Sequence, residues 1–82
     1  MQYYVTQENN ILLAYDKNSD FLAIFNNKSK KWELSKYSFI QIRHDFCLNE
    51  IKKEEVLRLT NNLLPSELYD YFVETIKNNK NI

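Results

Sequence analysis

Ile11-Leu-Leu-Ala-Tyr-Asp-Lys-Asn-Ser-Asp20 is followed directly by a second segment of the same pattern, Phe21-Leu-Ala-Ile-Phe-Asn-Asn-Lys-Ser-Lys30. Each segment begins with five apolar residues and ends with polar residues that favour turns. This spacing is typical of strands linked by hairpins. The chain contains no glycine, so we expect asparagine and aspartate to form the turns, because both tolerate left-handed backbone.

Similar patterns flank these two segments. Tyr3-Tyr4-Val5-Thr6 precedes them and is rich in strand-forming residues, and Lys31-Trp32-Glu33-Leu34 begins a third copy after them. The sequence therefore predicts an antiparallel β-meander of four strands, at residues 2–7, 11–16, 21–26 and 31–35.

The last third of the chain carries a helical pattern over residues 49–78. Glu54 and Glu55 form an acidic first turn after Lys52, the implied N-cap, and Pro65 is favoured in the first turn of a second helix. We expect two helices here, followed by a frayed tail at 79–82. The second helix has an apolar stripe of Leu64, Leu68, Tyr71, Phe72 and Ile76.

Residues 36–48 form a connecting segment with a mixed signal. Ser35 can cap a short helix, whereas Ile40-Gln41-Ile42-Arg43 alternates like a strand. We expect a short helical turn followed by an extended segment. The 82 residues then form one small domain of the α+β class, in which the meander of residues 1–35 packs against two C-terminal helices.

Loop lengths assign the side chains of the meander to two faces. If 17–20 and 27–30 are four-residue loops, Asp16 lies opposite Phe21 and Asn26 opposite Lys31. One face, rich in aromatic residues, collects Leu12, Ala14, Phe21, Ala23, Phe25, Trp32 and Leu34. The second face collects Ile11, Leu13, Tyr15, Leu22 and Ile24, with Lys31, Glu33 and Ser35 at its rim.

The central strands are thus apolar on both faces, whereas two short helices cover only one face. We expect the helices on the aromatic face, which leaves the second face to residues 35–48, to a second copy of the chain or to a foreign partner. The hypothesis that follows is a protein-binding surface. Its contacts are Leu13, Tyr15, Leu22 and Ile24, with Lys31 and Glu33 as rim.

The composition excludes several kinds of catalytic site. Without glycine the chain cannot form a Walker A loop, a dinucleotide fingerprint or a serine nucleophile elbow. One cysteine, Cys47, and one histidine, His44, cannot supply the usual zinc ligands, and they cannot meet if their segment is extended. We expect no enzymatic activity, no cofactor and no metal.

Asp16, Asn18 and Asp20 resemble the first ligands of a calcium loop, but Phe21 and Asn27 stand where that loop needs glycine and glutamate. A hairpin turn explains these residues better. The remaining alternatives are an enzyme built on Cys47 and a nucleic-acid binder. The second would use the basic and aromatic strip formed by Lys28, Lys30, Lys31, Trp32, Lys36, Tyr37, Arg43 and His44.

Eleven basic and eleven acidic residues leave no net charge, which disfavours nucleic acid as the partner. The N-terminus has no signal-peptide pattern and the longest apolar runs have five residues, so we expect a cytoplasmic protein and no membrane partner. The abundant asparagine and lysine are typical of AT-rich bacterial or phage genes. The sequence predicts a small protein-binding module, a stoichiometric regulator or inhibitor of another protein.

Overall fold

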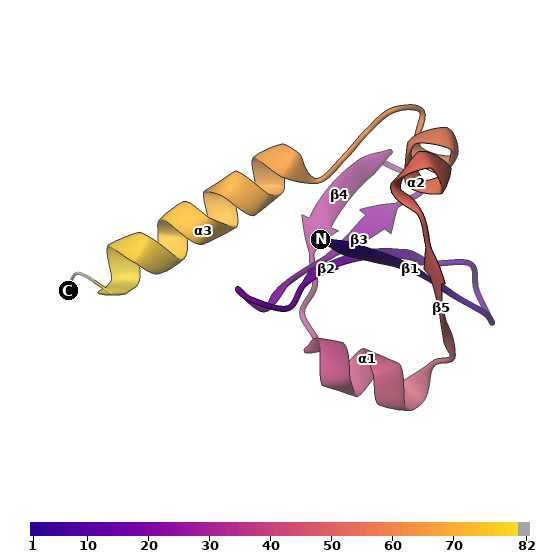
Figure 1. Cartoon of the computed structure of the whole chain (residues 1–82), viewed down its shortest axis with the longest axis horizontal. Coiled ribbons are helices and arrows are strands. Elements are labelled where there is room, and N and C mark those ends of the chain that lie inside the picture. Colours follow the sequence, from indigo (N-terminus) through magenta and orange to yellow (C-terminus); the bar gives the residue numbers. More distant parts are fainter. Residues whose placement is uncertain (81–82) are drawn as a thin grey trace.

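An antiparallel sheet of five strands forms the centre of the computed structural model, which describes residues 1–80 and the side chains of residues 1–77. The strands are β1 (Gln2–Thr6), β2 (Leu12–Asp16), β3 (Phe21–Asn26), β4 (Lys31–Leu34) and β5 (Leu48–Ile51), and their spatial order is β4-β3-β2-β1-β5. The helices are α1 (Phe39–Asp45), α2 (Lys53–Thr60) and α3 (Ser66–Lys80), as Figure 1 shows.

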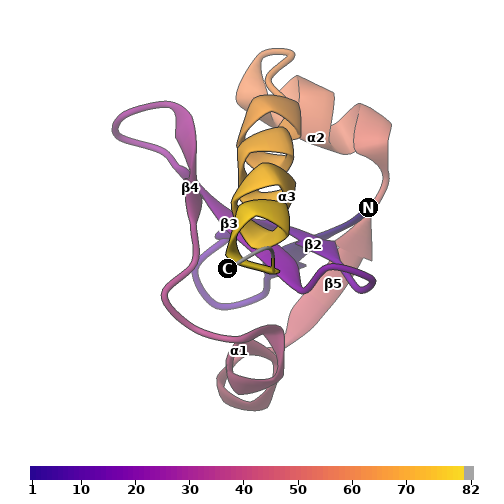
Figure 2. The same ribbon diagram turned by 90° about the vertical axis from the view of Figure 1, so that its left-hand side faces the viewer.

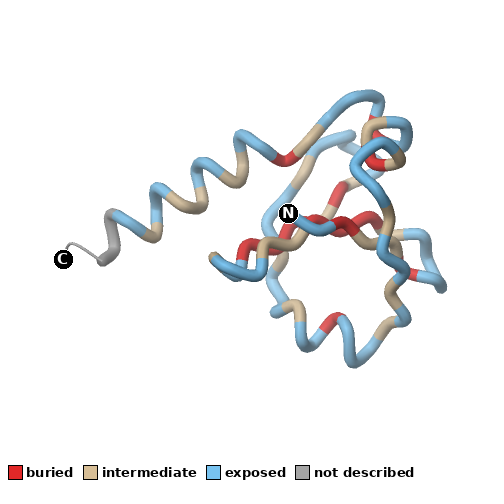
Figure 3. Tube along the Cα trace, in the orientation of Figure 1, coloured by how far each residue is buried: buried red, intermediate tan, exposed pale blue. Residues whose placement is uncertain are grey.

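The helices lie on both sides of this sheet. α2 and α3 pack on the aromatic face, and α1 lies on the opposite face (Figures 1 and 2). The buried residues are concentrated in the central strands, whereas α3 alternates between exposed and half-buried positions (Figure 3). The predicted α+β class, with the meander packed against two C-terminal helices, is confirmed.

Two of the three turns of the meander place an asparagine or an aspartate in left-handed backbone, as expected of a chain without glycine, whereas the third turn uses Lys30. Asn10, Asp20 and Lys30 have left-handed backbone with φ of 54°, 62° and 59°, and the Lys30 N–H donates to the Asn26 carbonyl at 2.8 Å. The predicted register is confirmed, since Asp16 pairs with Phe21 and Asn26 with Lys31. The face of each side chain in the meander follows from this register.

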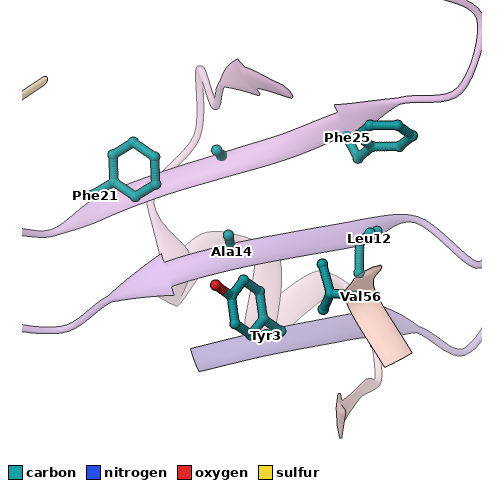
Figure 4. Packing of buried hydrophobic residues seen from close by; sticks show 7 residues of the cluster. Tyr3, Leu12, Ala14, Phe21, Phe25 and Val56 are labelled. Atoms are coloured by element: carbon teal, nitrogen blue, oxygen red, sulfur yellow. The ribbon is translucent and has the colours of Figure 1, made fainter. Parts of the chain in front are cut away.

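The core of the aromatic face lies between the sheet and two helices. Phe21 is fully buried and packs edge-on against Tyr69 and Phe72 of α3, with ring centroids 5.3 and 5.4 Å apart. Val56 of α2 closes the other end of this core (Figure 4). The aromatic side chains of β3 therefore hold α3 against the sheet.

The prediction that residues 49–78 are helical is wrong at its beginning. Residues 49–51 belong to β5, which pairs with β1 and places Ile51 opposite Tyr3. Without this strand the backbone of β1 would have no partner on that side. α2 begins after Lys52, the predicted N-cap, which makes no side-chain capping bond. At the other end α3 runs to Lys80, beyond the predicted limit at 78, and the rest of the expected frayed tail lies outside the described residues.

The connecting segment forms α1 and then the extended residues that lead into β5, as expected. The N-cap is Ser38, whose hydroxyl accepts the N–H of Gln41, and not Ser35. Ser35 is used differently because its N–H donates to the Leu22 carbonyl and so continues the β3–β4 ladder. Its hydroxyl donates to the Tyr37 carbonyl at 2.8 Å.

α1 covers the second face of the sheet. Leu13 and Leu22 are 1% and 5% exposed and form a cluster with Ile42 of α1. Phe39 stacks on Tyr15 with ring centroids 4.0 Å apart and an interplanar angle of 11°. The expectation that helices cover only one face is therefore wrong, and the alternative in which residues 35–48 fold underneath the sheet holds.

We predict that Leu22→Lys destabilises the fold by about 3 kcal/mol or more, because it places an unpaired charge between the sheet and α1. Urea unfolding followed by the fluorescence of Trp32, the only tryptophan, measures this loss. The matched control is Ile40→Lys on the outer side of α1, where the side chain is 80% exposed and the change stays within about 0.5 kcal/mol. Equal stability of the two variants would contradict the position of α1.

A hydrogen-bonded cluster ties α3 to the β2–β3 turn. One carboxylate oxygen of Asp16 accepts the hydroxyl of Ser19 at 2.7 Å and the hydroxyl of Tyr69 at 2.9 Å. These bonds, that of Ser19 most of all, hold the pKa of Asp16 below its ordinary value. The bond to Asp16 raises the pKa of Tyr69. The cluster fixes the position at which α3 crosses the sheet.

Since the pKa of Asp16 is lower in the folded state, its contribution to stability is present above the pKa of the unfolded chain and is lost as pH falls through the folded value. We predict that Tyr69→Phe lowers the urea midpoint near pH 7, and that the difference from the unmodified chain shrinks toward about pH 3. Tyr71→Phe is the control, because that ring is mainly exposed. The same loss at both pH values would argue against the Asp16 bond.

Candidate functional site

β4 forms an open edge of the sheet. It pairs only with β3, and within the described chain no strand lies beyond it (Figure 2). Because the Ser35 N–H donates to Leu22, the alternation of an antiparallel ladder directs the backbone of Lys31 and Glu33 toward β3. The same alternation leaves the N–H and C=O groups of Trp32 and Leu34 pointing away from the sheet.

Apolar side chains border this edge on the aromatic face. Trp32 packs against Phe25 at 5.4 Å, and its indole N–H donates to the Leu63 carbonyl at 3.2 Å. Leu34 and Leu63 are 40% and 43% exposed. We call the set that lines this side of the molecule the β4 surface, and it consists of Trp32, Leu34, Leu63, Leu68 and Tyr71.

A groove of about 390 Å³ separates the start of β4 from the start of α3. Its lining includes the apolar residues Trp32 and Leu68 and the charged residues Lys30, Lys31 and Glu67. The bond from Trp32 to Leu63 joins the strand to the α2–α3 connection. The β4 surface therefore depends on the contact between β4 and the α2–α3 connection, which are distant in the sequence.

Tyr71 does not lie on the buried stripe of α3 as predicted, because its ring is 63% exposed. The neighbouring Tyr69 packs into the core in its place. Tyr71 is three residues after Leu68, which lines the β4 groove, so the helical repeat places the two side chains on the same side of α3. If the apolar stripe of this helix is instead centred between Leu68 and Tyr69, Tyr71 falls outside it. That choice would have predicted from the sequence that Tyr71 is exposed.

The residues predicted as a protein-binding surface are separated in the structure. Leu13 and Leu22 are buried beneath α1, so they are not accessible to a partner. Tyr15 and Ile24 are half-buried in the same cluster. Lys31 and Glu33 are exposed on β4, where Glu33 accepts a hydrogen bond from the Asn26 amide at 3.2 Å. Of the residues predicted to contact a partner, only the rim residues Lys31 and Glu33 lie on the open edge of the sheet.

The lysines around β4 form a local basic region. Residues 27–37 contain four lysines and one glutamate, a formal charge of +3. The lysines Lys28, Lys30, Lys31 and Lys36 are all exposed. Within the part of the chain that the structure describes, neither the Arg58–Glu55 ion pair nor the contact between His44 and Asp45 involves any of them. The chain has no net charge, but the region around β4 carries a local excess of positive charge.

The predicted basic and aromatic strip is divided between two faces. Trp32 lies on the aromatic face, where its ring is held by Phe25 and Leu63. Lys31 lies on the opposite face, because side chains alternate along a strand. Tyr37 is exposed but follows β4 in the connection to α1. The pattern does not form one platform on which successive bases could stack.

His44 and Cys47 have different hydrogen-bond partners in the structure. His44 lies near the end of α1 and contacts Asp45 at 3.2 Å, whereas Cys47 follows the helix and donates its backbone N–H to Glu8 at 3.3 Å. Both side chains are exposed. Among the described residues no three histidine, cysteine or acidic side chains are grouped as metal ligands would be, and no helix is long and apolar enough to span a membrane.

Another groove, of about 640 Å³, lies between β1, β5 and the beginnings of α2 and α3. Its charged residues are of both signs, with Lys52 and Lys53 beside Glu50 and Asp70. No buried side-chain nitrogen or oxygen among the described residues lacks a hydrogen-bond partner. The charged side chains of this groove balance one another, whereas the region around β4 has an excess of lysines.

No family model, no curated protein and no solved structure matches this chain.

Proposed function

We propose that this chain is a small non-enzymatic protein-binding module and that the β4 surface is its contact site. The observation that carries the proposal is the coincidence of an unpaired strand edge with exposed Leu34, Leu63 and Tyr71. Single exposed apolar residues are common on proteins, but a group of them beside an open edge is typical of an interaction surface.

Burial of this surface by a partner is energetically useful. A half-exposed leucine contributes roughly 1 kcal/mol when its remaining apolar area is removed from water. The aromatic ring of Tyr71 adds area and a hydroxyl that can stay in contact with solvent. Trp32 is already held in place, so it loses little side-chain entropy on binding.

Such a module acts stoichiometrically, as a regulator or inhibitor of another protein in the cytoplasm. Binding alone suffices for that role. The alternative of nucleic-acid binding is favoured by the +3 charge of residues 27–37. It is disfavoured by the position of Trp32, which is held against Phe25 and Leu63.

We predict that a chain with Leu34→Thr and Tyr71→Ser loses its partner while its unfolding midpoint is nearly unchanged. The test is affinity capture from the source organism, with the unmodified chain, this double variant and Ile40→Lys compared side by side. A protein retained by the unmodified chain and by Ile40→Lys should be recovered at least roughly tenfold less with the double variant.

Equal recovery with all three chains would contradict the assignment of the β4 surface. Loss with Ile40→Lys alone would move the contact site to α1. A solitary monomer in light scattering that captures no protein would count against a binding module altogether.

A further inference from the structure

We infer that the partner supplies an extended segment with acidic side chains, which pairs with β4 as a sixth strand of the sheet. This inference rests on the proposed function and names the chemistry of the partner at the same surface. It follows from the backbone at the edge, from the charges around it and from the difference between the two edges of the sheet.

The backbone of β4 is prepared for strand addition. Trp32 and Leu34 each direct one N–H and one C=O away from the sheet. An added antiparallel strand also presents hydrogen-bonding groups at every second residue, so its spacing matches theirs. In strand addition these main-chain bonds supply affinity, and the side chains that alternate along the partner supply specificity.

Alternate side chains of the added strand would meet different surroundings. On the aromatic face they would lie beside Leu34 and Tyr71, which suits apolar residues. On the opposite face they would lie beside Lys31 and Glu33. A segment that alternates between apolar and polar residues therefore fits both faces.

The charges around the edge select the sign of these polar residues. The exposed lysines of residues 27–37 outnumber the single Glu33, whose carboxylate already accepts the Asn26 amide. Lysines on an edge strand oppose pairing with another basic strand, because like charges opposite each other are destabilising. The same lysines attract an acidic strand.

β5, at the other edge of the sheet, does not combine outward backbone groups with lysines and exposed apolar side chains. In β5 the bond from the Gln7 N–H to the Cys47 carbonyl leaves the backbone of Leu48 and Glu50 pointing outward. The strand itself contains a carboxylate and no lysine, and both of its apolar residues, Leu48 and Ile51, are half-buried. Specific addition of an acidic strand is therefore expected at β4.

The first experiment uses blocked peptides of about seven residues, long enough to pair along β4. One alternates valine with glutamate and the other alternates valine with lysine. We expect the glutamate peptide to change the fluorescence of Trp32 and to bind at least roughly tenfold more tightly than the lysine peptide at low salt. A variant with Lys31→Glu and Lys36→Glu should reverse this preference.

The second experiment tests the main-chain bonds. Leu34→Pro removes an N–H that points away from the sheet and leaves the ladder to β3 intact, and Leu34→Val is the matched control that keeps the N–H. We expect the proline variant to bind the glutamate peptide roughly fivefold more weakly than the valine variant. In the unmodified chain, a saturating amount of this peptide should slow amide exchange of Trp32 and Leu34 roughly tenfold, which gives a result even if the proline variant does not fold.

The inference is overturned if neither peptide binds, if both bind alike, or if exchange at Trp32 and Leu34 does not change. It is also overturned if an oligothymidylate binds more tightly than the glutamate peptide. If amide exchange at Trp32 and Leu34 is already slow without any peptide, and light scattering detects dimers, a second copy of the chain is the occupant of the edge. The proposed function survives these outcomes if the double variant at Leu34 and Tyr71 still loses its captured protein, and it fails separately if that capture is unchanged.

Discussion

The two central strands, β2 and β3, are apolar on both faces, and the rest of the molecule satisfies this constraint. On one face Phe21 and Phe25 require the cover of α3 and α2, and on the other Leu13 and Leu22 require α1. A helix of seven residues suffices for the second face because Phe39 and Ile42 of α1 and its C-cap residue Phe46 all pack in the cluster on that face. A chain of this size thereby builds three layers from one sheet and short helices.

Closing both faces leaves the edges of the sheet as its open part. β5 extends the sheet beyond β1, so the first strand of the meander is internal and β4 is the edge that remains at the end of the meander. The hydrogen bonds that Ser19 and Tyr69 donate to Asp16 set the position at which α3 crosses the aromatic face. Its course brings Leu68 to the groove along β4, and Tyr71 follows on the same side of the helix.

Lysine around β4 has two physical consequences. It protects an open edge from pairing with another basic strand, which is a common device in natural sheets. It also gives a neutral protein a local positive field, which favours encounter with acidic segments and disfavours basic ones. Under the proposed function, this charge would favour an acidic segment as the strand that pairs with β4.

The local pattern of the first 35 residues was enough to predict the strands, their register and the two faces, because hairpin loops and alternation are short-range constraints. Lys52 as an N-cap and the helix after Pro65 also followed from neighbouring residues. Three features depended on packing between distant segments. They are the burial of Leu13 and Leu22 under α1, the pairing of residues 48–51 with β1, and the outward position of Tyr71. A short segment that can be helix or strand takes the form that satisfies the unpaired backbone and uncovered apolar surface nearest to it, and those neighbours exist only once the chain has folded.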